Sequence, residues 1–97
     1  MLYMVNRSPL STSSLESVLR IAPAGSPILL YEDGIYAVVP GARSAPLVQA
    51  ALEKHPIYAL DADLEARGIA TVLEGVQVIG YDGFVELVEQ HDVAPWL

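Results

Sequence analysis

Residues 28–31, Ile-Leu-Leu-Tyr, constrain the fold more than any other part of the chain, because they form a strand-like run without polar alternation. A strand of this kind must be covered on both faces, as in a parallel sheet flanked by helices. Asp33-Gly34 follows at once and predicts a turn, since glycine accepts positive φ and aspartate bonds to nearby backbone. We interpret the apolar residues 35–39 as the first turns of a helix or a short buried segment.

The rest of the chain alternates between strand and helix patterns. Ser13 and Glu16 form a capping box that predicts a helix start, and Asp61 and Asp82 are suited to cap later helices. We expect strands at residues 2–5, 57–60 and 76–79, and helices at residues 14–22, 45–54, 61–67 and 83–90. This order predicts an α/β fold: a small three-layer α/β/α sandwich with a mainly parallel four- or five-stranded sheet. No composition shift divides the chain, so residues 1–97 are expected to form one domain.

The terminal Trp96-Leu97 is an apolar group that follows the last predicted helix. Such a group rarely floats freely in water. It is expected either to pack back on its own domain or to enter a neighbouring protein.

Composition points to a protein interface. Hydrophobic residues make up 53% of the chain and charged residues 18%, whereas ordinary domains carry about 25% charged residues. No apolar run is long enough for a membrane span, and the N-terminal segment does not have the pattern of a signal peptide, so we expect a cytoplasmic protein. The net charge of −7 disfavours direct nucleic-acid binding. The absence of cysteine excludes a disulfide, a thiolate metal site and a covalent sulfur intermediate.

Few residues form a pattern that indicates chemistry. Glu32 and Asp33 are a candidate general acid and base at a strand end, but a solvated turn is the simpler interpretation because no second catalytic residue type converges on them. His55 and His91 match no metal-ligand spacing and are interpreted as surface histidines. No phosphate-binding glycine motif is present. We therefore expect no catalytic residue, no cofactor and no metal.

Several blocks spread along the whole chain resemble the DsrH/TusB family. They are Val5-Asn6-Arg7-Ser8-Pro9, the segment Ser-Leu-Glu-Ser-Val-Leu-Arg at 14–20, Leu-Tyr-Glu-Asp-Gly-Ile-Tyr-Ala at 30–37, Tyr-Ala-Leu at 58–60 with Asp-Leu-Glu-Ala-Arg-Gly at 63–68, Tyr-Asp-Gly-Phe-Val at 81–85, and Trp96-Leu97. The resemblance implies a DsrE-like fold and a heterohexamer with two copies of each of three related subunits. In such complexes sulfur travels as a persulfide on cysteines.

Many DsrH-like members carry a cysteine in a Ser-Leu-Glu-Ser-Cys-Leu context, and Val18 occupies that position here. Valine cannot hold a persulfide. The resemblance then implies a non-catalytic structural subunit of a TusBCD-like complex that supports 2-thiolation of tRNA wobble uridine, with TusC/TusD-like partners.

Two alternatives stay open at this point. The first is a DsrH-like subunit of a DsrEFH complex in dissimilatory sulfur oxidation, with DsrF/DsrE-like partners. The second is a stand-alone small-molecule-binding enzyme that uses Glu32 and Asp33. Expressed alone, the chain is expected to self-associate as a homo-oligomer or to aggregate. Candidate residues for a partner interface or crevice are Ser8, Glu32, Asp33, Tyr36 and Trp96.

Overall fold

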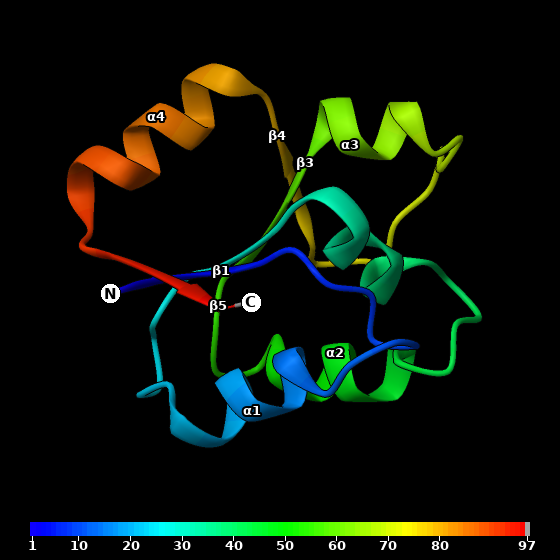
Figure 1. Ribbon diagram of the computed structural model, residues 1–97, viewed down its shortest axis with the longest axis horizontal. Coiled ribbons are helices and arrows are strands. Elements are labelled where there is room, and N and C mark those ends of the chain that lie inside the picture. The colour runs from blue at the N-terminus through cyan, green and yellow to red at the C-terminus, as the bar shows by residue number, and fades with distance from the viewer. Residues whose placement is uncertain (97) are drawn as a thin grey trace.

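The computed structural model describes residues 1–96, and its centre is a sheet of five parallel strands in the order β4-β3-β2-β1-β5 (Figure 1). The expected α/β fold with a mainly parallel sheet is confirmed. The strands are β1 (Leu2–Val5), β2 (Ile28–Leu30), β3 (Ile57–Leu60), β4 (Gln77–Ile79) and β5 (Val93–Trp96). The helices are α1 (Ser14–Ile21), the 3-10 helix η1 (Glu32–Val38), α2 (Ala45–Ala51), α3 (Asp61–Ala66) and α4 (Tyr81–Gln90).

Strand order explains which helix covers which face of the sheet. From β1 to β4 the chain adds each new strand on the same side, so right-handed crossovers put the intervening helices on one face. The connection from β4 to β5 crosses back over the whole sheet, and its helix α4 lies on the opposite face from α1 and α2 (Figure 1). Within residues 1–96, several helices therefore cover one face of the sheet, and α4 alone covers the other.

Strand β2 is the most buried strand, as its sequence predicts. All three of its residues have no exposed surface, and it pairs with β1 on one side and β3 on the other. Strand β3 lies where the sequence predicts it, but it is less completely buried than β2. Its Ile57 and Ala59 are buried against the larger core, but Tyr58 and Leu60 are only partly buried because their face is covered by α4 alone.

Helix starts differ from the predicted capping pattern. Ser13 precedes α1, but no side-chain hydrogen bond caps this helix, and the hydroxyl of Thr12 instead donates to Ser14 Oγ at 3.1 Å. Helices α3 and α4 begin at Asp61 and Tyr81, so Asp61 and Asp82 lie inside the first turns and cap neither helix. Carboxylates at these positions still interact favourably with the helix dipole.

The turn after β2 is built differently from the prediction. The residue with positive φ is Glu32, at 48°, and Gly34 does not adopt positive φ. Glycine is required at position 34 for another reason: a Cβ there would collide with the backbone carbonyl oxygen of Val5. Helix η1 thus passes directly over the end of β1, and residues 35–39 fall almost entirely within it.

The C-terminal segment packs back on its own chain. It forms β5, which pairs in parallel with β1 and makes the fifth strand of the sheet. The Trp96 ring meets Tyr3 edge to face, with ring centroids 6.2 Å apart and planes at 65°. Leu97, the other half of the predicted apolar group, lies outside the described residues.

Candidate functional site

Three side chains converge at the carboxyl edge of the sheet, where the segments following β2 and β3 lie next to each other. Arg67, just after α3, places Nη2 and Nε each 3.0 Å from Asp33 Oδ1 in η1. Its Nη1 lies 3.7 Å from Asp63 Oδ1 and donates to the Asp63 backbone oxygen at 3.4 Å. We call Asp33, Asp63 and Arg67 the strand-end cluster; it ties η1 to α3.

The strand-end cluster also holds the unusual backbone of Glu32. The backbone N–H of Glu32 donates to Asp63 Oδ2 at 2.8 Å. A non-glycine residue in the left-handed region is strained by roughly 1–2 kcal/mol, and a hydrogen bond to a carboxylate offsets about that amount. Asp63 therefore stabilises the turn that carries both Glu32 and Asp33.

The geometry does not assemble an acid-base site from Glu32 and Asp33. Both are exposed, and the Asp33 side chain, 60% exposed, is bound by the Arg67 guanidinium. Burial, and secondarily the Glu32 charge, raises the pKa of the neighbouring Tyr31 phenol, so Tyr31 stays a neutral hydroxyl at physiological pH. The contacts of the strand-end cluster hold the turn after β2 in place.

The remaining candidate residues lie apart from the strand-end cluster and make no side-chain hydrogen bond to it. Ser8 shapes the turn after β1: its hydroxyl accepts the Leu10 N–H at 3.2 Å and its carbonyl accepts two further N–H groups. Tyr36 is exposed on η1, and Trp96 is partly buried on β5. Val18 has no exposed surface and lies on the face of α1 that packs into the core.

The sequence predicts that both histidines are surface residues, and this is wrong for His55. It is buried, with Nδ1 2.9 Å from the backbone oxygen of Ser26, and it joins the loops before β2 and β3. Within residues 1–96, no three His, Asp or Glu side chains lie close enough to hold a metal ion. None of the helices in this range has the length and apolar content needed to cross a bilayer.

Sequence reasoning identified Glu32 and Asp33 but missed that Asp63 and Arg67 join them. The acidic and basic residues of α3 are already explained by favourable interaction with the helix dipole. This explanation therefore gives no reason to expect the contact between Arg67 and Asp33. The available signal was the i, i+4 spacing of Asp63 and Arg67 on a helix that follows a strand neighbouring β2.

Fold and side chains together define a class: a small α/β protein with a five-stranded parallel sheet and no thiol. The family described as DsrH like protein matches residues 7–94. Protein TusB of Serratia proteamaculans is 41% identical over 94% of both chains, and protein TusB of Erwinia tasmaniensis is 42% identical over 90% of both. The chain belongs to the DsrH like protein family, which confirms the resemblance.

Solved structures agree on the fold. The ychN protein of E. coli superposes with a TM-score of 0.80 at 18% identity, covering 98% of this chain and 97% of the other. Protein MTH1491 of Methanobacterium thermoautotrophicum gives a TM-score of 0.72 at 16% identity, covering 97% and 96%. The DsrE-like α/β sandwich that the sequence predicts is confirmed.

Proposed function

We propose that this protein is a non-catalytic structural subunit of a cytoplasmic, TusBCD-like heterohexamer that relays sulfur for 2-thiolation of tRNA wobble uridine. Its partners would be TusC- and TusD-like subunits, and residues 1–97 would act as one domain. Membership of the DsrH like protein family and full-length similarity to proteins named TusB support this function.

The observation that carries the proposal is the absence of any group that can hold sulfur. The chain has no cysteine, and Val18, at the position where DsrH-like members can carry one, is 0% exposed in the core. Persulfide transfer needs a thiolate to attack and a thiolate to leave. Sulfur must therefore travel on a cysteine of another subunit, while this chain shapes the assembly.

The apolar surface supports a role in assembly. In the described part of the chain, α4 is the one helix on the second face of the sheet, where Met4, Tyr58, Leu60 and Ile79 are partly buried. Helix α4 adds the exposed Tyr81, 77% accessible, next to this face. Leu10, before α1, and Ile21, at its end, are also 79% and 53% exposed. A large apolar surface left exposed is typical of a subunit that buries it against partners.

Co-expression with TusC- and TusD-like subunits tests the proposal. We expect a defined hexamer by size-exclusion chromatography with light scattering, and self-association of the chain expressed alone. After exposure to a persulfide donor, mass spectrometry should find the added sulfur on a partner and not on this chain. A well-behaved monomer that ignores both partners, or a reductant-labile gain of one sulfur on this chain, would refute the proposal.

A further inference from the structure

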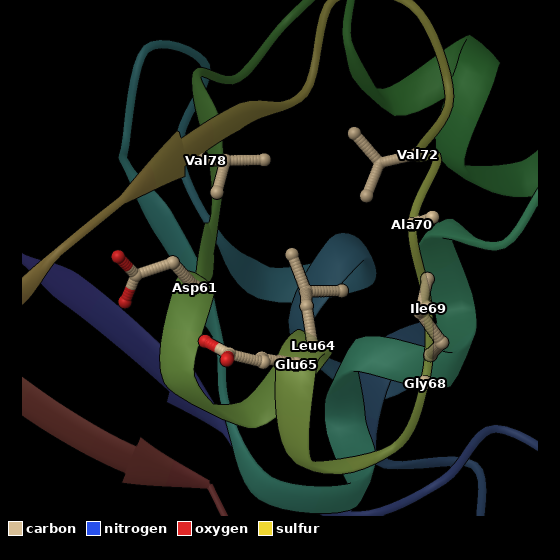
Figure 2. Close-up of a pocket in the computed structure, with 8 residues that line it drawn as sticks. All are labelled: Asp61, Leu64, Glu65, Gly68, Ile69, Ala70, Val72 and Val78. Carbon is tan, nitrogen blue, oxygen red and sulfur yellow. The ribbon is translucent and has the colours of Figure 1, made fainter.

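A pocket of about 400 Å³ lies beside β4, at the opposite edge of the sheet from β5. Its walls are mostly apolar: Figure 2 shows Leu64, Val72 and Val78 surrounding the hollow from α3, the loop after it and β4. Val78 is 48% exposed although it belongs to the sheet. The mostly apolar lining suits an apolar group, and no part of residues 1–96 fills the pocket.

The strand next to this pocket has an open hydrogen-bonding edge. Strand β4 pairs with β3 on one side and has no neighbour on the other within the described residues. Natural proteins protect such edges with lysine or proline, or by keeping the edge strand very short. Strand β4 has the sequence Gln-Val-Ile, so it contains neither lysine nor proline, and its three residues leave a short open edge. The other edge strand, β5, contains Pro95, which has no N–H to offer a further strand.

The rim of the pocket is acidic. Asp61 and Glu65 lie one turn apart on α3 and both line the pocket (Figure 2). Neither forms a salt bridge among the described residues, and the nearby Arg67 is occupied by Asp33 and Asp63. A second copy of this chain fits poorly, because pairing two β4 edges would bring these carboxylates together.

We propose that β4 and its pocket form a docking site for an extended, basic segment of a different protein. The segment adds to the sheet through backbone hydrogen bonds to β4, as in other strand-addition complexes. Alternate side chains of a strand share one face. An apolar side chain therefore enters the pocket beside Val78, and the arginine or lysine two residues away reaches Asp61 and Glu65.

This inference goes beyond the proposed function, because it holds whichever sulfur pathway the complex serves. The probe is the peptide Thr-Arg-Thr-Ile-Thr-Arg-Thr, whose palindromic order allows both strand directions; its control replaces both arginines with glutamate. Binding is read by hydrogen–deuterium exchange and mass spectrometry on the chain in the assembly in which it purifies. We expect the basic peptide to slow exchange of residues 76–80, and the acidic peptide to leave it unchanged.

Variants separate this site from general charge attraction. Val78→Lys should abolish the protection. Asp61→Asn with Glu65→Gln should weaken binding about fivefold, since both carboxylates are exposed and an exposed ion pair contributes modestly. Val93→Lys, a matched change on the other edge strand, should have no effect. No protection, equal protection by the acidic peptide, or equal binding by all variants would overturn the proposal.

The assembly itself provides one further outcome. If residues 76–80 already exchange as slowly as β2 before peptide is added, a partner subunit occupies the edge. Val78→Lys must then release that subunit. An assembly that stays intact with this variant would also overturn the proposal.

Discussion

Val18→Cys tests whether a thiol at this position of the family could hold sulfur in this fold. Val18 is 0% exposed and lies on the buried stripe of α1 with Leu15. A cysteine is nearly the size of valine, so we expect the variant to fold with a loss of about 1 kcal/mol in free energy of unfolding. Burial in apolar surroundings raises the pKa of a thiol and makes it inert.

The expected protection follows from the packing. A reagent reaches the thiol only when α1 separates from the sheet, which exposes residue 18 and Leu15. Burying each side chain contributes roughly 2 kcal/mol, so local opening costs at least about 4 kcal/mol. At about 1.4 kcal/mol per factor of ten, the thiol is reachable in roughly one molecule in a thousand. Reaction should slow by that factor relative to an exposed thiol.

The assay is modification by an aromatic disulfide reagent, followed by absorbance and mass spectrometry. Ser13→Cys is the matched control, because Ser13 is exposed just before the same helix. The control should react at the rate of a free thiol, and the Val18→Cys thiol should react fully only in denaturant. If Val18→Cys in the native protein reacts within tenfold of the control, helix α1 does not seal this position and the reasoning fails.

Three further predictions concern the turn after β2. Gly34→Ala should lower the free energy of unfolding by about 3 kcal/mol, because its Cβ would collide with the backbone of Val5. Gly41→Ala is the control: it has open space at positive φ and should cost about 1 kcal/mol. Equal losses for the two variants in urea titrations would contradict this prediction. Asp63→Ala should lower the free energy of unfolding by about 1–2 kcal/mol, because Asp63 holds the backbone N–H of Glu32. Adding Glu32→Gly should recover part of this loss, because glycine adopts positive φ freely. A double-mutant cycle that finds no coupling between the two positions would contradict the proposed role of Asp63. The raised pKa of Tyr31 means that its contribution to stability is present below about pH 10 and is lost as pH rises through the folded pKa. Tyr31→Phe should therefore remove part of the loss of thermal stability above about pH 10, and an unchanged profile would show that another group titrates.

Most of the fold can be read from the sequence because its signals are local. The apolar run at β2 demands cover on both faces, and the alternation of elements then implies a parallel sheet. Local signals cannot show where a strand lies within the sheet. Tyr58 and Leu60 are partly exposed because, among the described residues, α4 is the one helix on their face of the sheet. Strand β5 was missed as a strand because Pro95 is a poor strand residue except at an edge.

The candidate site was less predictable because it depends on contacts between distant residues. Asp33 and Arg67 are 34 positions apart, and nothing local distinguishes their ion pair from an exposed turn and a helix end. The same holds for the Val5 carbonyl that requires Gly34, since glycine after aspartate also fits an ordinary turn. Buried His55 was missed because its partner, the Ser26 carbonyl, belongs to another loop.

The difference between the two edges of the sheet limits how copies of this protein can join. A fibre grows only when each molecule offers two complementary edges, so that every addition leaves a new one. Here Pro95 gives β5 no N–H for a further strand at that position, so β4 is the edge that can accept one among the described strands. Once a segment of another protein occupies β4, this sheet offers no second edge for a further addition, which favours assemblies of defined size over open-ended polymers.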